Sequence, residues 1–358
     1  MEELVNPWHG RRVFLTGHTG FKGGWLALLL ASRGARVRGY ALDPATVPNL
    51  FEIASVATIL DDVRGDIRDR EKLASSMADF APDVVFHLAA QPLVQQSYAE
   101  PVVTFATNIM GTAHVLEAVR STPTVRAVVC VTTDKCYENK EWVWPYRETD
   151  ALGGHDPYSS SKACAEIVSA AYRSSFFPVD RIQEHRVALA TARAGNVIGG
   201  GDWSADRLLP DLVRGFQSKQ AVPIRRPGAI RPWQHVLEPL HGYMMLAEQL
   251  LKGDERFASA FNFGPGDEDA WSVERIATTV TKMWGEGASW IRDAVPGMHE
   301  AHSLRLDASK AHAELGWRPH LPIEEALEWT ISWYQNWRRG ADMHRETYAQ
   351  IKAYDKLL

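Results

Sequence analysis

The sequence predicts an α/β fold in which an open, doubly wound parallel sheet is followed by a smaller C-terminal lobe. Two observations favour this fold. Short apolar runs alternate with segments of helical apolar spacing through the first half of the chain, as parallel βαβ units require. After about residue 199 the alternation gives way to glycine-rich and basic irregular stretches. We therefore expect one domain over 1–199 and a ligand-binding lobe over 200–358, and we leave open that the chain crosses between them.

Each expected element follows from its local pattern. The first strand is the apolar run 12–16, and the helix after it, 21–32, has apolar residues at helical spacing. Further runs of strand type lie at 35–42, 63–67, 83–87, 125–131 and 188–193. Helical patterns lie at 70–80, 101–120, 157–171, 236–251 and 273–284, and a last helix with an apolar stripe begins after Pro322. Because right-handed crossovers bring the carboxyl ends of the strands to one edge of the sheet, we expect ligands to bind at that edge.

Composition and charge limit the classes of partner. The 358 residues are 45% hydrophobic and 23% charged, the mix of a globular protein with a sizeable core. Lys and Arg number 39 and Asp and Glu number 44, which gives a net charge of −5. A mildly acidic chain is not expected to bind nucleic acid or an acidic lipid surface.

Cysteine usage and the start of the chain predict a cytoplasmic location. Cys130, Cys136 and Cys164 are too few for a disulfide framework and lack metal-site spacing with histidines, so we expect no disulfide and no metal. Residues 1–10 lack the apolar core of a signal peptide, and the apolar run 25–31 is too short to span a bilayer. We therefore expect no membrane partner.

A glycine-rich turn, Thr16-Gly-His-Thr-Gly-Phe-Lys-Gly23, joins the first strand to the first helix. Its glycines permit a tight turn, close approach of a pyrophosphate and close helix–sheet packing. The amino end of the helix adds free N–H groups and a partial positive charge. The strand–turn–helix context predicts a Rossmann-type dinucleotide site, with a plain turn as the alternative. The candidate cofactor-binding residues of this turn are Gly17, His18, Thr19, Gly20, Phe21, Lys22 and Gly23.

Residues after the next strands indicate which dinucleotide binds. Asp43 follows the second strand, where an acid accepts ribose hydroxyls and repels a 2′-phosphate, so NAD is favoured over NADP. Asp43-Pro44 is also a good turn start, which is the competing interpretation. Asp66 and Ile67 follow the third strand, where Asp66 is expected near the adenine. Small residues after the fourth strand leave room for a dinucleotide across the sheet, in the segment Leu88, Ala89, Ala90 and Gln91.

Tyr158 and Lys162 lie one helical turn apart, so the phenol and the ammonium can converge. A nearby ammonium favours the phenolate and lowers the pKa of the tyrosine. The result is a base that can take a hydroxyl proton while hydride leaves the same carbon. Such a pair is common on helix surfaces, but behind a dinucleotide turn it indicates oxidoreductase chemistry.

A second group of polar residues ends the strand that precedes this helix. Thr133 can hydrogen-bond a sugar hydroxyl, and Asp134 and Lys135 are both capable of proton transfer. Asp134 as a turn cap and Lys135 as a solvated charge are the alternatives. The position at the carboxyl end of a strand favours a functional role.

Several of these motifs resemble the extended short-chain dehydrogenase/reductase family over nearly the whole chain. They are the glycine turn 16–23, Leu88-Ala-Ala-Gln91, Thr133 and Tyr158-x-x-x-Lys162. Within that family, Asp134 after the threonine is similar to the nucleotide-sugar 4,6-dehydratases. Further segments resemble the branch that acts on CDP-glucose, namely 17–23, 133–137, 141–144, 193–203, 231–236 and 261–265.

The resemblance implies an NAD-dependent hydro-lyase with CDP-D-glucose as substrate and CDP-4-dehydro-6-deoxy-D-glucose and water as products. Tyr158 would take the 4-hydroxyl proton, Asp134 would protonate the departing 6-hydroxyl, and the catalytic group would also include Thr133, Lys135 and Lys162. The dTDP-glucose relatives carry Glu where this chain has Lys135, so removal of the C5 proton by Lys135, or by another base, stays open. The implied substrate-binding residues are Thr133, Asn196, Arg207, Arg231, Trp233, His235 and Arg305.

The resemblance also implies a homodimer or higher homo-oligomer, because the family pairs helices that correspond to 100–120 and 157–172. Two other functions remain open. A nucleotide-sugar 4-epimerase would use the same tyrosine and lysine without needing the Asp134 acid. A non-catalytic dinucleotide sensor would not require the Tyr158–Lys162 pair.

Overall fold

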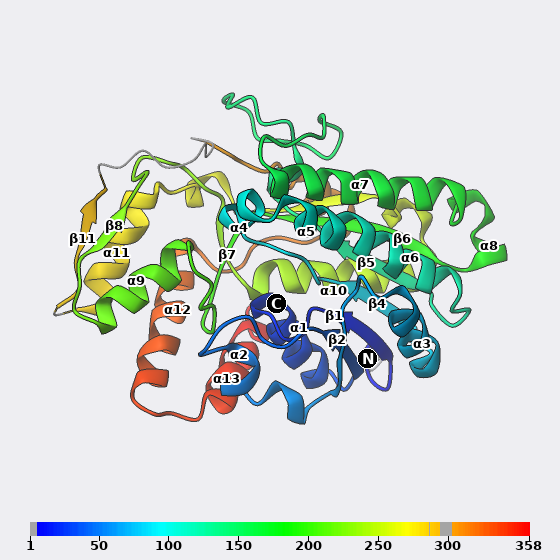
Figure 1. Ribbon diagram of the computed structural model, residues 1–358, viewed down its shortest axis with the longest axis horizontal. Coiled ribbons are helices and arrows are strands. Elements are labelled where there is room, and N and C mark those ends of the chain that lie inside the picture. The colour runs from blue at the N-terminus through cyan, green and yellow to red at the C-terminus, as the bar shows by residue number, and fades with distance from the viewer. Residues whose placement is uncertain (1–5, 286, 294–302) are drawn as a thin grey trace.

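A seven-stranded parallel sheet forms the centre of the computed structural model, which describes residues 6–285, 287–293 and 303–358 (Figure 1). The strand order is β10-β6-β5-β4-β1-β2-β3. The strands are β1 (Arg12–Thr16), β2 (Arg36–Ala41), β3 (Asp61–Arg64), β4 (Val84–His87), β5 (Ala127–Val131), β6 (Ala188–Ala194) and β10 (Ala260–Phe263). The order reverses between β1 and β4, so the carboxyl ends of these two strands flank the crevice where doubly wound folds bind ligands. The predicted fold class is confirmed.

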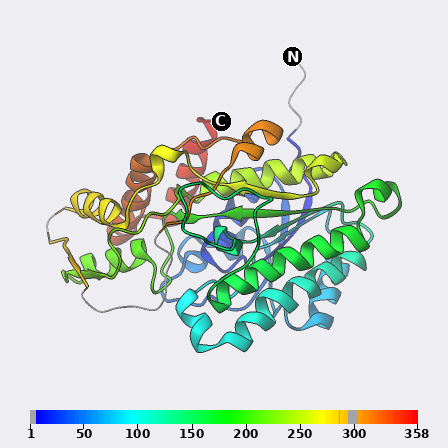
Figure 2. The ribbon, with the colours of Figure 1, turned by 90° about the horizontal axis from the view of Figure 1, so that it is seen from above.

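Helices cover both faces of the sheet, as Figure 2 shows from above. One face packs against α3 (Arg70–Phe80), α6 (Gly111–Arg120) and α7 (Pro157–Ser175), and the other against α1 (Phe21–Ser32) and α10 (Leu237–Leu251). Alternate residues of each strand face the two cores: Phe14 belongs to the first core, and its neighbours Val13 and Leu15 to the second. Both faces are therefore buried, which explains why the central strands are apolar throughout.

The smaller lobe lies beyond the carboxyl edge of the sheet (Figure 1). It holds two short parallel pairs, β7 (Asn196–Ile198) with β9 (Trp233–His235) and β8 (Val222–Ile224) with β11 (Trp290–Arg292). Its helices are α9 (Leu208–Gln217), α11 (Val273–Trp284) and α12 (Ile323–Arg338). The described residues also form the helices α2 (Leu50–Ile53), α4 (Val94–Ala99), α5 (Pro101–Phe105), α8 (Ile182–His185) and α13 (Met343–Asp355).

The chain crosses between the two parts. After β9 it returns to the sheet as α10 and β10, where β10 forms the outer strand beside β6. It then enters the lobe again and ends on α13, which contacts α1. The division into 1–199 and 200–358 stays a prediction, since residues of the second part complete the sheet.

Two expected elements differ in the structure, and one strand of the central sheet was not expected. The third strand was expected at 63–67 but ends at Arg64, because Gly65-Asp66-Ile67 turns away at the sheet edge. The helix expected over 101–120 has a π-helical turn, Ala106–Met110, between α5 and α6. The outer strand β10 was not expected, because its run of four residues gives little periodic signal.

One helix of the described residues, Pro101–Arg120, is by length and composition apolar enough to cross a membrane, and 44% of its apolar 18-residue stretch is buried. In the structure it lies in the helix layer on the sheet, where α6 contacts both α3 and α7. A core helix of a folded domain has the same apolar character.

Candidate active site

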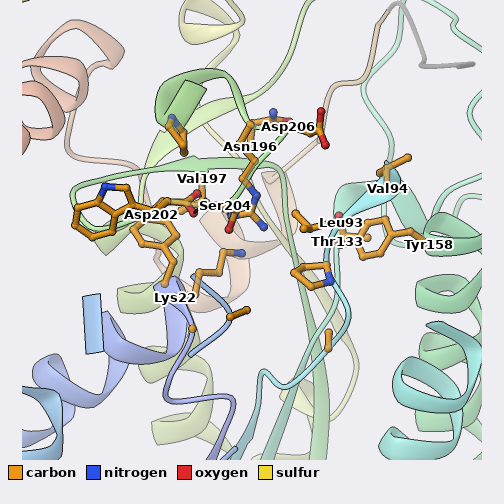
Figure 3. A pocket seen from close by; sticks show the side chains of 18 of the residues that line it. Lys22, Leu93, Val94, Thr133, Tyr158, Asn196, Val197, Asp202, Ser204 and Asp206 are labelled. Atoms are coloured by element: carbon orange, nitrogen blue, oxygen red, sulfur yellow. Dashed lines mark hydrogen bonds and ion pairs between the residues drawn. The ribbon is translucent and has the colours of Figure 1, made fainter. Parts of the chain in front are cut away.

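A cavity of about 610 Å³ opens at the carboxyl edge of the sheet, between β1, β4 and β5 and the smaller lobe. Figure 3 shows Lys22, Thr133 and Tyr158 facing it from the sheet side and Asn196, Asp202 and Asp206 from the lobe side. It is lined by most of the residues that the sequence predicted for a site: Gly17, Thr19, Gly20, Phe21, Lys22, Gly23, Asp43, Asp66, Ile67, Leu88, Ala89, Ala90, Thr133, Asp134, Lys135, Tyr158, Lys162, Asn196, Arg207, Arg231 and Trp233.

The glycine turn packs so closely that two of its glycines have no room for a side chain. Gly17 has a φ of +80°, and a Cβ there would lie 2.7 Å from the backbone nitrogen of Ala89. A Cβ on Gly23 would lie 2.0 Å from the carbonyl oxygen of Gly17. A Cβ on Gly20 would have that same oxygen as its nearest neighbour, at 3.4 Å, so this glycine leaves open space beside the turn. Helix α1 begins here with no side-chain cap, which suits the pyrophosphate of a dinucleotide.

Two residues predicted to bind the cofactor do not line the cavity. The His18 ring is fully buried, and its Nε2 lies 2.9 Å from Oδ1 of Asp62. The Gln91 side chain donates to Thr104 Oγ1 across 2.9 Å. Both side chains instead fix the loops around the crevice, so we leave them out of the proposed cofactor contacts.

Asp43 and Asp66 line the cavity at the end near β2 and β3. The Asp43 side chain is 89% exposed, and its Oδ1 lies 3.7 Å from Nε of Arg64. Asp66 forms a hydrogen-bonded ion pair with Arg68, and these hydrogen bonds hold the pKa of Asp66 below its usual value. The exposed Asp43 carboxylate can accept hydrogen bonds from a ribose. Both oxygens of Asp66 already accept hydrogen bonds from Arg68.

Thr133 and Asp134 form a hydrogen-bonded unit directly after β5. The Thr133 hydroxyl donates to Oδ1 of Asp134 across 2.8 Å and accepts from the Lys135 N–H at 3.3 Å. Asp134 is 2% exposed, and burial raises its pKa above the usual value. Its Oδ2 has no hydrogen-bond partner among the described residues. The unit can therefore hold a proton on a carboxyl that faces a ligand cavity.

Tyr158 and Lys162 lie on the first turns of α7, which Asp156 caps by accepting from the Ser159 N–H at 2.9 Å. The Lys162 ammonium donates to the Val131 carbonyl across 3.2 Å, and burial lowers the pKa of Lys162 to about 8. The sequence predicted a lowered pKa for Tyr158, and the structure corrects this. Burial raises the pKa of Tyr158 to about 12, and hydrogen bonding by Thr133 offsets only part of that rise.

Basic side chains from the glycine turn and from the lobe line the cavity. Lys22 is partly buried, and desolvation together with the charges of Arg207 and Lys162 lowers the pKa of Lys22 to about 7. Arg207 donates to Asp202 Oδ2 across 2.8 Å. A cluster of cations in a partly enclosed cavity is suited to phosphate oxygens.

The predicted substrate-binding residues divide into two groups. Asn196, Arg231 and Trp233 line the cavity, and the Trp233 indole is fixed by donating to the Trp271 carbonyl at 2.9 Å. His235 and Arg305 do not line it. His235 is fully buried between Trp25 and Trp329, with ring centroids 5.9 and 5.6 Å away, and burial lowers its pKa to about 3.

The recorded contact of Arg305 is made by its backbone outside the cavity: its carbonyl accepts a hydrogen bond from the Tyr146 N–H at 2.9 Å. The prediction of these two as substrate contacts is therefore not retained. Apolar neighbours close off His235, and the segment of Arg305 is tied to the loop of Tyr146.

Asn108, in the π-helical turn, was not expected from the sequence to support the site. Its amide donates to Ser161 Oγ across 2.8 Å, and its Oδ1 accepts from the Gln91 N–H at 2.8 Å. A buried asparagine in an apolar helix was a signal for this role, because a buried amide needs partners. Lobe residues of the lining, among them Ser204, Asp206 and Arg225, gave no local signal.

Metal chemistry has no candidate site in the part of the chain that the structure describes. No group of three or more His, Cys, Asp or Glu side chains there could hold a metal ion. The cavity instead combines a turn for a dinucleotide with acid, phenol and ammonium groups.

Comparisons with known proteins agree with this geometry. A family model described as GDP-mannose 4,6 dehydratase matches residues 14–330. The CDP-glucose 4,6-dehydratase of Salmonella typhimurium is 54% identical over 338 residues, which cover 94% of both chains. The dTDP-glucose 4,6-dehydratase of Streptomyces antibioticus is 29% identical over 340 residues, or 90% of this chain and 92% of that one.

Solved structures share the fold at lower identity. A dTDP-glucose 4,6-dehydratase of Streptomyces venezuelae, solved with NAD, superposes with a TM-score of 0.78 at 23% identity and covers 93% of this chain and 99% of that one. A UDP-glucose 4-epimerase of Thermotoga maritima gives 0.78 at 22% identity and covers 91% and 99%. The family match and the sequence identities, taken with the cavity and its residues, show that the chain belongs to the nucleotide-sugar 4,6-dehydratases of the extended short-chain dehydrogenase/reductase family.

Proposed function

We propose that the protein is an NAD-dependent hydro-lyase that converts CDP-D-glucose to CDP-4-dehydro-6-deoxy-D-glucose and water. The relative from Salmonella typhimurium supports the substrate and the reaction. One observation of the site supports dehydration in particular. Asp134 is a buried carboxyl with a raised pKa and a free oxygen in the same cavity as Tyr158, and a proton on that oxygen can leave with a hydroxyl group as water.

The cradle of the glycine turn fits NAD, because the open space at Gly20 and the uncapped start of α1 accept a pyrophosphate. Asp43 at the far end accepts ribose hydroxyls and disfavours an additional phosphate there. When bound, NAD would supply the hydride acceptor for C4 of the sugar and the hydride donor for C6, so the reaction would have no net redox change.

Tyr158 removes the proton of the sugar 4-hydroxyl. Thr133 hydrogen-bonds the same phenol and orients it. To the ammonium of Lys162, one helical turn further along α7, we assign the stabilisation of the phenolate. The raised pKa of Tyr158 means that this phenolate forms only when a bound ligand adds positive charge beside it. The base is thereby kept protonated until the substrate is in place.

The ketone formed at C4 acidifies the C5 proton, which is removed by Lys135, in the cavity wall beside Asp134, or by another base. The C6–O bond then breaks as Asp134 gives its proton to the departing hydroxyl, and a C5–C6 double bond forms with loss of water. The same base returns a proton to C5 at the end of the cycle. The ammonium and guanidinium groups of Lys22, Arg207 and Arg231, together with Asn196, hold the diphosphate and the sugar hydroxyls.

Incubation of the purified protein with CDP-glucose, UDP-glucose and dTDP-glucose in parallel tests this function, with products followed by mass. Loss of 18 mass units (one water) from CDP-glucose, with much less from the other two, is the expected result. Conversion of a sugar to its C4 epimer without loss of water would make the protein an epimerase. Binding of NAD without any sugar product would make it a sensor.

The enzyme is proposed to act in the cytoplasm as a homodimer or a higher homo-oligomer. Its three cysteines are free thiols, as in a reducing compartment. Apolar side chains on neighbouring helices are exposed on the α7 side of the sheet: Val102 is 77%, Met110 52% and Ile167 56% exposed. Sedimentation of the wild type and of Met110→Glu tests the pairing, since a charge at this face should shift a dimer toward monomer.

A further inference from the structure

A buried ion pair lies beneath the catalytic residues, on the side away from the cavity. Glu166 and Arg193 are 3% and 4% exposed, and Oε2 of Glu166 lies 2.9 Å from Nη2 of Arg193. Neither residue lines the cavity, and neither has a step in the reaction proposed above. A buried pair is seldom kept for stability alone, because desolvation offsets much of its attraction.

Glu166 occupies the same face of α7 as Tyr158 and Lys162, since the three residues follow one another at four-residue spacing. Its Oε1 accepts from the Thr132 hydroxyl at 2.5 Å, and its Oε2 also accepts from the Thr191 hydroxyl at 2.7 Å. Thr132 comes immediately after β5 and directly before Thr133. Strand β5 is thus fastened to α7 at two consecutive residues, by Lys162 on the Val131 carbonyl and by Glu166 on the Thr132 side chain.

Arg193 extends the same network to the segment that follows Asp134. Its Nη1 donates to the Tyr137 hydroxyl at 2.8 Å and to the Glu148 carbonyl at 3.2 Å. The Tyr137 hydroxyl in turn donates to Asn262 of β10 at 2.7 Å. The segment Thr133–Cys136 is therefore held at both ends by one buried network. We propose that Glu166, paired with Arg193, is a positioning residue of the active site, which holds Thr133 and Asp134 against Tyr158 and stabilises the ammonium form of Lys162.

The electrostatic part follows from which neighbours of Lys162 are charged. The ionisable groups that interact with it are Cys130, Cys136, Glu166, His87 and Lys22. Burial raises the pKa of both thiols and lowers that of His87, so these three are neutral near pH 7. The positive charge of Lys22 repels that of Lys162 and so disfavours the Lys162 ammonium. For Glu166, burial favours the neutral acid, but Arg193 and the hydrogen bonds lower its pKa and keep it ionised. Among these five groups, Glu166 thus provides the negative charge.

Three variants separate positioning from charge. Glu166→Gln keeps the shape of the side chain and removes its charge, so kcat should fall about tenfold. The alkaline limb of the kcat–pH profile should also move about one pH unit lower, because the Lys162 ammonium loses the negative charge that stabilises it. Glu166→Asp keeps the charge and shortens the reach to Thr132, so kcat should fall without movement of the limb. Glu238→Gln, a matched loss of a buried carboxylate outside the cavity, should leave the kcat–pH profile of the wild type. A Glu166→Gln profile that coincides with the wild type, with only a lower Tm, would overturn the proposal.

The inference rests on the proposed function, so a second readout needs no substrate. Hydrogen exchange of the backbone amides 131–136 should speed up in Glu166→Gln and in Thr132→Val, and not in Glu238→Gln. Exchange unchanged in both variants contradicts the positioning role, even if no sugar is turned over. If Glu166→Gln does not fold, Thr132→Val keeps the ion pair and should lower kcat with the alkaline limb in place; unchanged kcat in that variant overturns the proposal.

Discussion

The Thr133 hydroxyl donates its hydrogen to Oδ1 of Asp134 across 2.8 Å, which leaves Oδ2 as the free oxygen of a buried carboxyl. A threonine that orients a sugar hydroxyl would serve an epimerase equally well. Asp134 beside it provides a protonated carboxyl in the cavity, which an epimerase does not need. Burial raises the pKa of Asp134 and so favours its protonated form, because the ionised form is unfavourable where water cannot reach it.

Asp134→Asn should separate elimination from the preceding steps. The amide keeps the hydrogen bond from Thr133 but cannot give up a proton to a leaving hydroxyl. We expect dehydration to slow by about 10²-fold or more, while exchange of the C5 hydrogen with solvent deuterium continues. Mass spectrometry of the residual substrate and of the product measures both rates. Asp79→Asn, an exposed ion-pair partner of Arg38, is the control; normal dehydration by Asp134→Asn would show that another group is the acid.

Tyr158→Phe should abolish the first step without loss of substrate binding. The phenyl ring fills the same volume but has no oxygen to take the 4-hydroxyl proton. We expect turnover to fall by at least about 10²-fold, with the Kd for CDP-glucose within about threefold of the wild type by calorimetry. Tyr348→Phe on α13, outside the cavity, should keep full activity. Retained turnover in Tyr158→Phe would contradict the base role.

The sequence predicted the sheet and the near side of the site because both depend on local signals. Apolar runs with helical segments between them define β1, β2, β4, β5 and β6. The glycine turn and the Tyr158–Lys162 spacing are likewise short patterns of residues close together in the chain. Right-handed crossovers between parallel strands bring the carboxyl ends of the strands to one edge of the sheet. Residues on β1, β4, β5 and α7 therefore converge as expected.

The far side of the site depends on contacts that no local pattern encodes. Trp233 and His235 belong to the same short strand, yet Trp233 lines the cavity and His235 packs between two tryptophans. Which of the two reaches the cavity is decided by the pairing of β9 with β7 and by its packing against α12. The raised pKa of Tyr158 is likewise a consequence of tertiary burial, which outweighs the local effect that the helix spacing predicted.

Asp43→Ser should weaken the discrimination between NAD and NADP. The Asp43 carboxylate is exposed and lies 3.7 Å from the Arg64 guanidinium, so its removal takes away a repulsive charge and releases a cation that can pair with a 2′-phosphate. We expect the ratio of Kd values for NADP and NAD to fall about tenfold or more. Titration of both dinucleotides by protein fluorescence measures it. An unchanged ratio would mean that Asp43 does not face the ribose, and Asp43 would then be a turn residue only.

Glu238 should make the stability of the fold depend on pH near neutrality. It is fully buried on α10, accepts from the Leu321 N–H at 2.7 Å and the Tyr354 hydroxyl at 2.8 Å, and burial raises its pKa to about 7. A carboxyl whose pKa is higher in the folded than in the unfolded chain stabilises the fold at low pH. That stability is lost as the pH rises from the unfolded pKa of about 4.5 through 7.

Glu238→Gln removes this dependence. The Tm of the variant should rise relative to the wild type between pH 5 and pH 8, by an amount that corresponds to at most about 3 kcal/mol in the free energy of unfolding. Thermal unfolding at half-unit pH steps measures the difference, and Glu324→Gln, exposed on the first turn of α12, is the control that should follow the wild type. Parallel curves for Glu238→Gln and the wild type would mean that Glu238 stays ionised in the fold, held by the three donors from the C-terminal segments rather than neutralised by burial.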